Sequence, residues 1–310
     1  RTGCGKSQTS RRVTHVLKDL GKKEVAIRHP MPYGKLAEQI VQRFATFEDL
    51  DRHDCTIEER EEYEPHLTNG VVVYAGIDYA AILAQAEQEA DVIVWDGGNN
   101  DTPFYKPDLW IAVTDPHRAG HERDYFPGTV NFERADLILI NKVDSADEAD
   151  IDSIEENARD MNPGATVVRA SSPLDLPDPE AIRGKRVLAV EDGPTTTHGG
   201  MPFGAGVLAA RQYGAAEIVD PRPWAVGEIA ETYLQYPDTG ALLPAMGYGE
   251  RQVRDLEGTV NAADCDLVLV ATPIDLSRIM RIDKPHMRVS YRLVEEGDAL
   301  AEAVKRVATA

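Results

Sequence analysis

The chain opens with Arg1-Thr2-Gly3-Cys4-Gly5-Lys6-Ser7, which reads as the second to eighth positions of the phosphate-binding motif G-x-x-x-x-G-K-[ST]. In such a loop, successive backbone N–H groups converge on a phosphate, and the following helix adds the positive end of its dipole. Residues 8–20 are expected to form that helix, ending at Gly21. The predicted nucleotide-binding residues of this stretch are Thr2, Gly3, Cys4, Gly5, Lys6, Ser7 and Gln8.

Within this loop, Lys6 is the predicted catalytic cation that bridges the β- and γ-phosphates of ATP or GTP, and Ser7 is a predicted Mg²⁺ ligand. The leading glycine of the motif and the strand that feeds the loop are expected upstream of Arg1. We therefore expect a chain that lacks its first strand.

Strand-like and helical segments alternate along the rest of the sequence, which predicts an α/β fold with a mostly parallel sheet flanked by helices. A proline-punctuated segment, 172–179, divides this pattern. We expect a nucleotide-binding domain over residues 1–178 and a further α/β region over residues 179–310. Among the expected elements are strands over 25–28, 71–75, 92–96 and 137–141 and helices over 36–44, 79–89, 205–213 and 299–307.

Two acidic strand ends extend the nucleotide site. Asp96 follows the apolar run 92–95 and is the predicted partner of Ser7 in holding Mg²⁺, and a candidate catalytic residue. Asn141-Lys142-Val143-Asp144 is an N-K-x-D box after the run 137–140. The carboxylate of Asp144 can accept two hydrogen bonds from guanine, whereas adenine would turn a lone pair towards it. Asn141 would tie loops together and the stem of Lys142 would cover the base, so the box favours GTP.

Basic side chains follow two other strands, at the sheet edge where α/β folds bind ligands. Arg28 and His29 follow one, and His117, Arg118 and His121 follow the other. They would suit a second, phosphorylated substrate, with His117 and Arg118 in catalytic roles. The alternatives are a metal pair at His117 and His121, or loop residues paired with nearby acids. Residues 191–201 offer further candidate substrate contacts, Asp192, Thr195 and His198, or else a long connection that caps a helix.

The composition limits the partners. With 33 basic and 53 acidic residues, the chain carries a formal charge of −20, which argues against nucleic acid and membrane surfaces as partners. This acidity suits a halophilic protein that works in concentrated salt. Three distant cysteines suggest no disulfide framework and a cytoplasmic location. The expected partners are a small phosphorylated substrate and, as an open alternative, a second copy of the chain in a homo-oligomer.

Five motifs together resemble the archaeal cyclic 2,3-diphosphoglycerate synthetase family, whose relatives are catalogued as predicted GTPases. The motifs are the stretches 28–34, 96–101, 115–118, 191–195 and 272–276. The resemblance implies a P-loop NTPase fold, a further N-terminal domain, and an ATP-driven closure of 2,3-diphosphoglycerate into a cyclic phosphoanhydride. It also implies that Arg28, His29, His117 and Arg118 hold the diphosphoglycerate.

Two hypotheses of function follow. In the first, the protein is a phosphoryl-transfer ligase in which Lys6 and Mg²⁺ assist the movement of the γ-phosphoryl group onto a small phosphorylated substrate. In the second, it is a GTPase that acts as a switch or assembly factor, with residues 99–101 and the loop after Arg28 sensing the γ-phosphate.

Overall fold

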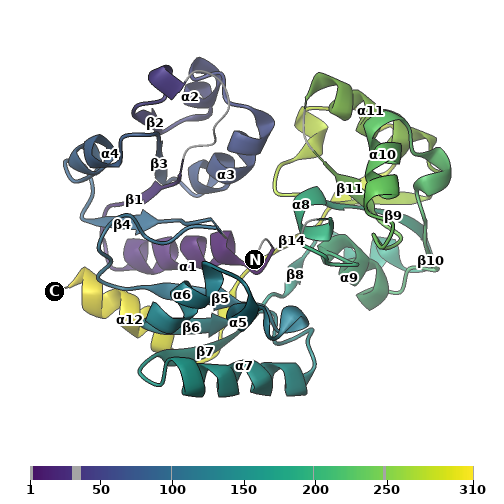
Figure 1. Ribbon diagram of the computed structural model, residues 1–310. Coiled ribbons are helices and arrows are strands. Elements are labelled where there is room, and N and C mark those ends of the chain that lie inside the picture. Colours follow the sequence, from purple (N-terminus) through teal and green to yellow (C-terminus); the bar gives the residue numbers. More distant parts are fainter. Residues whose placement is uncertain (1–2, 30–35, 99, 198, 247–248, 310) are drawn as a thin grey trace. The chain divides into compact units, whose positions relative to one another are not determined.

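A computed structural model describes residues 3–29, 36–98, 100–197, 199–246 and 249–309 (Figure 1). The chain divides into two compact units. The first comprises Arg1–Cys55, Glu62–Pro173 and Leu293–Ala310, and the second comprises Thr56–Glu61 and Leu174–Arg292. The chain thus returns to the first unit at its C-terminal end, whereas the sequence pattern had placed residues 293–310 with the second region.

The first unit alternates strands and helices, as the sequence pattern predicted. Its elements are α1 (Lys6–Asp19), β1 (Glu24–Ile27), the 3₁₀ helix η1 (Leu36–Glu38), β2 (Gln42–Phe44), α2 (Phe47–Arg52), α3 (Ile57–Thr68, which begins in the range 56–61), β3 (Val72–Ala75), α4 (Tyr79–Ala86), β4 (Val92–Trp95), β5 (Ile111–Thr114), η2 (Pro116–Arg118), α5 (His121–Asp124), α6 (Gly128–Arg134), β6 (Leu137–Ile140), α7 (Glu148–Met161), β7 (Thr166–Ser171), β15 (Val294–Glu295) and α12 (Ala299–Ala308).

These strands form two four-stranded sheets, in the orders β2-β3-β1-β4 and β15-β7-β6-β5. Strands β3, β1 and β4 are parallel, and so are β7, β6 and β5, whereas β2 and β15 each join an edge in antiparallel register. Within the described residues, β4 and β5 are edge strands of their respective sheets. Parallel strands place the loops at their carboxyl ends along one edge, where α/β folds bind ligands.

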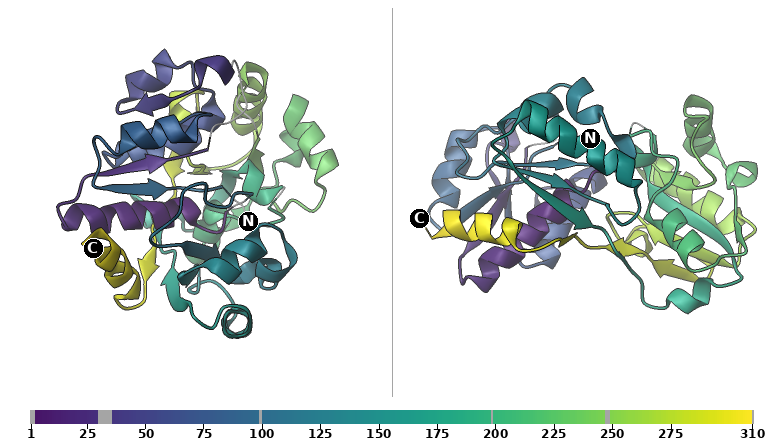
Figure 2. Two further views of the ribbon diagram at one scale, coloured as in Figure 1. Left: turned by 60° about the vertical axis from the view of Figure 1, so that its left-hand side comes forward. Right: turned by 90° about the horizontal axis from the view of Figure 1, so that it is seen from below.

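Helix α1 packs against both sheets. Val16 and Leu17 on α1 are buried in one apolar cluster with Leu139 of β6, and Val94 of β4 packs against the same cluster. Leu300 of α12 joins this core, and α12 lies beside α1 (Figure 2). The apolar residues of α12 recur with helical spacing, so that the last helix buries one stripe against the first unit.

The prediction of a helix over residues 36–44 is wrong. Only the 3₁₀ turn η1 forms there, followed by β2, which pairs with β3. Gln42 and Phe44 are buried and Arg43 between them is exposed, which is the alternation of a strand with one face on the core. Phe44 contributes that buried face by stacking on the ring of Tyr63, 4.8 Å away.

The second unit is a smaller parallel α/β sheet around β9. Its elements are β8 (Leu174–Asp175), η3 (Pro179–Ile182), β9 (Arg186–Asp192), α8 (Gly193–Thr196), α9 (Ala205–Gln212), β10 (Glu217–Ile218), η4 (Arg222–Trp224), α10 (Gly227–Gln235), β11 (Leu243–Ala245), α11 (Glu250–Ala262), β12 (Leu267–Ala271), η5 (Leu276–Arg278), β13 (His286–Arg288) and β14 (Ser290–Tyr291). The strand order is β10-β9-β12-β13. Strand β11 pairs with residues 190–192 of β9, whereas β10 pairs with residues 186–187 of the same strand. Val187, Leu188, Ala189 and Val190 of β9 are all fully buried, so the strand is covered on both faces.

Candidate functional site

Residues 3–5 form a tight turn directly in front of α1, which begins at Lys6. Gly3 (φ 76°) and Gly5 (φ 107°) adopt the left-handed backbone region that favours glycine. Cys4 between them is 2% exposed. Burial alone would raise the pKa of the Cys4 thiol, but the nearby Lys6 ammonium lowers it overall, which indicates a positive potential at the turn. The N-terminal end of α1 adds to this potential, so the turn is suited to a phosphate. Thr2 lies outside the described residues.

The N-K-x-D box lies against this turn. The side-chain amide of Asn141 donates to the carbonyl oxygen of Cys4 at 3.0 Å. The approach is so close that a Cβ on Gly5 would lie 2.1 Å from Asn141 Nδ2, so the turn needs glycine here for space as well as for backbone angle. The Ser172 hydroxyl donates to Asn141 Oδ1 at 3.1 Å. Asn141 therefore ties the phosphate turn to two strand ends, as the sequence suggested.

Asp144 is exposed, and its Oδ1 accepts the backbone N–H of Ser172 at 2.9 Å. This bond holds the exposed carboxylate of Asp144 beside the end of β7. Lys142 has a left-handed φ of 62°, and its Nζ lies 2.8 Å from Asp115 Oδ2. The ammonium group of Lys142 is therefore held by the buried carboxylate of Asp115, which follows the neighbouring strand β5.

Asp96 is enclosed by donors rather than open to solvent. Its Oδ1 accepts from Ser10 Oγ at 2.9 Å and lies 3.2 Å from Arg28 Nη1, and its Oδ2 lies 2.9 Å from His66 Nε2. Burial alone would raise the pKa of Asp96, but Arg28 and His66 lower it, so the carboxyl group stays ionised.

This enclosure bears on the predicted Mg²⁺ site. Both oxygens of Asp96 already have donors, so the described arrangement does not offer Asp96 as a direct ligand. Among the residues that the structure describes, no group of three His, Cys, Asp or Glu side chains is placed to hold a metal ion. Ser7, the first-turn hydroxyl of α1, remains the residue whose chemistry fits Mg²⁺ beside a phosphate. The expectation of Mg²⁺ thus rests on Ser7 and the phosphates of a nucleotide.

Arg28 does not project towards a substrate. It is 4% exposed, donates to the carbonyl oxygen of Asp96 at 2.6 Å, and pairs with Glu62 of α3. Its positive charge is thus shared by two carboxylates of the chain, and a substrate phosphate would have to displace them. The sequence did not single out Glu62 or His66. Glu62 lies in the acidic stretch 56–64, which is typical of a solvated helix face, and His66 follows that stretch.

His29, the residue after Arg28, is only half-buried. Its Nδ1 lies 2.8 Å from Asp101 Oδ2, and the same oxygen accepts the backbone N–H of Gly98 at 2.7 Å. His29 follows β1 and Asp101 follows β4. These strands are parallel neighbours, with Ile27 opposite Trp95, so the two side chains meet at the carboxyl edge of the sheet.

The second basic loop, 115–121, is organised around Asp115. Arg118 is 8% exposed, and its Nη2 donates to Asp115 Oδ2 at 2.8 Å. Burial tends to raise the pKa of Asp115, but Lys142 and Arg118 lower it overall. The guanidinium of Arg118 is therefore held by a buried acid, as in the alternative in which loop residues pair locally.

The two histidines of this loop face different neighbours. His117 Nε2 lies 3.0 Å from Ser145 Oγ, and burial lowers the pKa of the ring. The ring of His121 lies 4.7 Å from the ring of Tyr125. Among the described residues, neither ring belongs to a group of three His, Cys, Asp or Glu side chains that could hold a metal ion.

In the second unit, Asp192 accepts a hydrogen bond from the Thr195 hydroxyl at the start of the short helix α8. His198 lies outside the described residues. Glu191, the residue before Asp192, is 2% exposed, and its Oε1 accepts the N–H of Val207 at 2.8 Å. Burial raises the pKa of Glu191 to about 7, although backbone N–H groups of Val207, Gly206 and Gly204 oppose the shift. The G-x-G-x-x-A stretch 204–209 therefore encloses a carboxylate of the chain itself.

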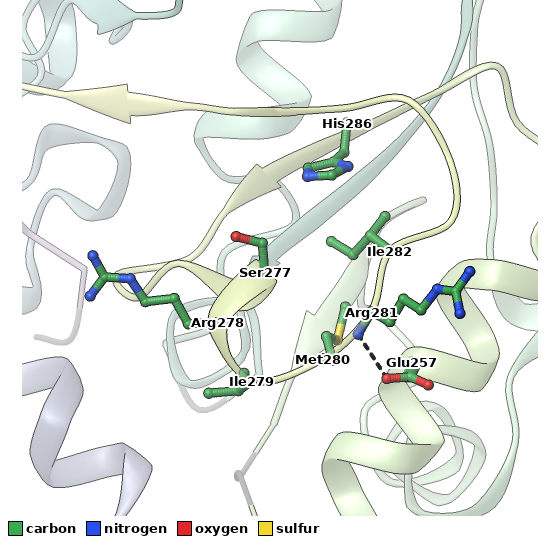
Figure 3. A pocket seen from close by; sticks show the side chains of 8 residues that line it. All are labelled: Glu257, Ser277, Arg278, Ile279, Met280, Arg281, Ile282 and His286. Carbon is green, nitrogen blue, oxygen red and sulfur yellow. Dashed lines mark hydrogen bonds between the residues drawn. The ribbon is translucent and has the colours of Figure 1, made fainter. Parts of the chain in front are cut away.

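The second unit also has a shallow groove of about 520 Å³. Figure 3 shows its lining, in which Arg278, Arg281 and His286 stand around apolar side chains. The backbone N–H of Arg281 donates to Glu257 at 2.8 Å. None of the predicted site residues lines this groove.

A family model described as the CobW/HypB/UreG nucleotide-binding domain matches residues 77–169. The solved structure of LpxK from Aquifex aeolicus in complex with ATP is similar, with a TM-score of 0.54 at 14% identity, over 98% of this chain and 84% of that one. Together with the turn before α1, these likenesses decide the fold. The chain has the P-loop NTPase fold.

The chain is also 62% identical over 297 residues to the arginine synthetase ArcE of Thermococcus kodakarensis. The match covers 96% of this chain and 66% of that protein, so this P-loop chain spans just under two thirds of its relative's length. The relative's name differs from the cyclic 2,3-diphosphoglycerate synthetase activity that the motifs implied. In the described part of the chain, no helix is long and apolar enough to cross a membrane.

Proposed function

We propose that the chain is the nucleotide-binding part of an NTP-dependent synthetase that forms arginine. The observation that carries this proposal is the 62% identity to an arginine synthetase along 96% of the chain. The nucleotide-binding family match and the glycine turn before α1 support the binding of a nucleotide.

The roles of the residues follow from their places. Backbone N–H groups of residues 3–7 and the start of α1 hold the β-phosphate. Lys6 neutralises charge on the phosphoryl group that moves, and Ser7 would hold Mg²⁺, which offsets phosphate charge when bound. Asn141 keeps the turn in shape through Cys4.

The chemistry of arginine formation explains why a nucleotide is needed. A guanidinium group can be made from a precursor that has an oxygen atom in place of one nitrogen. That oxygen would have to leave as hydroxide, which is a poor leaving group. Transfer of the γ-phosphoryl group to that oxygen makes it leave as phosphate, and ammonia then takes its place. L-citrulline is the amino acid with this substitution and is therefore the first precursor to test.

Two other functions remain as alternatives. Cyclisation of 2,3-diphosphoglycerate is the activity that the five motifs imply, and it would use the same P-loop. A GTPase switch is favoured by the oriented, exposed carboxylate of Asp144 in the N-K-x-D box, because that carboxylate suits guanine.

One set of incubations separates these functions. The purified protein is given ATP or GTP with L-citrulline and ammonium, with 2,3-diphosphoglycerate, or with neither, and products are followed by mass spectrometry and ³¹P NMR. Arginine that appears only with nucleotide supports the proposal. A cyclic phosphoanhydride, or GTP turnover indifferent to both substrates, would replace it with the corresponding alternative.

A matched pair of variants checks that any turnover belongs to this site. Lys6→Ala removes the phosphate-binding cation and should abolish nucleotide binding. Lys18→Ala removes a lysine at the other end of the same helix and should leave binding as in the native protein. Unchanged binding in Lys6→Ala would refute the assignment of the loop.

A further inference from the structure

Within the N-K-x-D box, residues 142–145 form a closed turn. The backbone N–H of Ser145 donates to the carbonyl oxygen of Lys142 at 3.1 Å. This bond closes a β-turn in which Val143 and Asp144 hold the two central positions. Lys142 has the left-handed φ of 62°, which is uncommon for a residue other than glycine. The place of the Asp144 carboxylate therefore depends on how the two ends of this turn are held.

Side chains of the segment 115–118 hold both ends of this turn. Asp115 Oδ2 lies 2.8 Å from the ammonium group of Lys142, which starts the turn. At the other end, the ring Nε2 of His117 lies 3.0 Å from the hydroxyl oxygen of Ser145. The segment follows β5 and the turn follows β6, and these two strands are parallel neighbours. Segment 115–118 thus supports the turn from the neighbouring strand end.

Segment 115–118 is itself fixed by Asp115, which is 5% exposed. Its Oδ2 accepts from Arg118 Nη2 at 2.8 Å, and its Oδ1 accepts the backbone N–H of His117 at 3.2 Å. The backbone N–H of Arg118 donates to the carbonyl oxygen of Asp115 at 2.9 Å. Burial tends to raise the pKa of Asp115, but Lys142 and Arg118 lower it overall. The carboxylate is therefore ionised and accepts from both cations.

These contacts favour a supporting role for the segment over the binding of a second substrate. Arg118 and Lys142 share the carboxylate of Asp115, so a substrate phosphate would have to compete with a buried anion for both cations. Asn141, the residue before Lys142, donates to the carbonyl oxygen of Cys4. The box is thus held by the phosphate turn on one side and by segment 115–118 on the other.

We propose that segment 115–118 positions the turn 142–145 for recognition of a guanine base, with Asp115 and His117 as the positioning residues. Neither residue contacts the nucleotide in this assignment, because both act through the turn that carries Asp144. The inference rests on the nucleotide-binding part of the proposed function. It gives segment 115–118 a role other than the binding of diphosphoglycerate that the motif resemblance implied.

The first test separates the base from the phosphates by calorimetric titration with GTP and with inorganic tripolyphosphate, which has no base. Asp115→Asn removes the charge that holds Lys142. It should lower the ratio of GTP affinity to tripolyphosphate affinity about tenfold. Tripolyphosphate itself should bind at least as tightly as it binds the native protein, because the substitution removes a negative charge.

Asp136→Asn is the matched control. Asp136 is an exposed aspartate just before β6, and it accepts the backbone N–H of Trp110 just before β5. It thus joins the same two strands at their amino ends, and its loss should leave both affinities at the native values. An equal loss for GTP and tripolyphosphate in Asp115→Asn would mean that Asp115 only stabilises the fold, and would overturn the proposal.

The second test asks whether Asp115 acts through Asp144. In the Asp144→Asn background, Asp115→Asn should cause little further loss of GTP affinity, because the carboxylate that it positions is already gone. Losses that add in the double variant would overturn the proposal. Native GTP binding in Asp144→Asn alone would overturn it too, since the turn would then carry no group that reads the base.

His117→Ala keeps the proposal testable if Asp115→Asn does not fold, because the side chain of His117 is only half-buried. The substitution releases the Ser145 end of the turn. The backbone amide of Ser145 should then exchange its hydrogen faster without nucleotide, and the GTP-to-tripolyphosphate ratio should fall. His15→Ala, which changes an exposed histidine of α1, is the matched control and should change neither. Native exchange at Ser145 together with a native ratio in His117→Ala would overturn the proposal.

These outcomes are distinct from those of the arginine assay. A protein that forms no arginine but shows the expected GTP-to-tripolyphosphate ratios would overturn the proposed reaction and support the role of segment 115–118. A native protein that binds GTP no more tightly than tripolyphosphate would overturn the role of the segment and leave the arginine-forming function standing.

Discussion

The side-chain amide of Asn141 donates a 3.0 Å hydrogen bond to the backbone carbonyl oxygen of Cys4, 137 residues earlier in the chain. One end of this bond lies in the phosphate turn and the other in the N-K-x-D box. The residue that would recognise the base and the residues that bind phosphate are thereby held in one rigid arrangement, because Asn141 also accepts from Ser172.

Asn141→Ala should loosen this arrangement. Asn141 is fully buried, so its loss leaves the Cys4 carbonyl without its donor at a cost of about 1–3 kcal/mol. We expect the free energy of unfolding to fall by that amount and nucleotide affinity to fall as well. Urea denaturation and calorimetric titration measure the two effects. Asn69→Ala, which removes a bond to the Pro65 carbonyl away from the turn, should leave nucleotide affinity at the native value, and an equal loss in both variants would contradict the prediction.

Asp144→Asn tests the choice of base. The amide replaces one carboxylate oxygen with a donor, so a guanine would lose a charged acceptor. We expect GTP to bind about tenfold more weakly or worse, which corresponds to about 1.4 kcal/mol, and ATP to bind as before. Equal effects on the two nucleotides would show that Asp144 does not read the base.

Arg28→Met tests the enclosure of Asp96. The substitution leaves a buried carboxylate short of its guanidinium, which costs about 3–5 kcal/mol. Because the pKa of Asp96 is lowered in the folded protein, this stabilisation is complete above the ordinary pKa of an aspartate and is lost as the pH falls below it. Urea denaturation of the native protein and the variant should therefore differ most near neutral pH.

Arg43→Met is the control for Arg28→Met. It breaks the pair with Glu89, in which the two side chains are 42% and 31% exposed, and such a pair contributes about 0–1 kcal/mol. A loss for Arg28→Met as small as this would mean that the Asp96 cluster contributes little to folding.

Glu191 should make the stability of the protein fall as the pH rises. Its pKa is raised from 4.5 to about 7, so the folded state holds a proton that the unfolded state releases between these values. The free energy of unfolding should decrease across this window by up to about 3 kcal/mol. Glu191→Gln cannot ionise, and its stability should be flatter over the same range. Parallel pH dependences in denaturation series from pH 5 to 8 would show that Glu191 does not titrate in this way.

The parts of the site that could be predicted are those encoded by consecutive residues. The turn before α1 and the N-K-x-D box are short motifs whose residue spacing determines their geometry. The alternation of strands and helices along the sequence predicts the α/β fold class. Strand β2 was missed because three residues between loops give too little periodicity to outweigh a helical reading.

The parts that could not be predicted depend on partners far along the chain. Arg28 resembled a substrate-binding group because its acids, Glu62 and Asp96, are 34 and 68 residues away. His66 lies in a helix whose charged sequence gave no sign that one of its faces meets a buried acid. Glu191 was not singled out because it begins the polar stretch 191–201, and the backbone groups that enclose it, at 204, 206 and 207, lie beyond that stretch.

Strands β4 and β5 each end a four-stranded sheet in the part of the chain that the structure describes, and both pack on the core that α1 shares. An edge strand keeps one row of N–H and C=O groups without a neighbour, and such a row is a template for another strand. In hydrogen exchange, amides on the outer side of β4 and β5 should therefore lose protection long before those of β1 and β6.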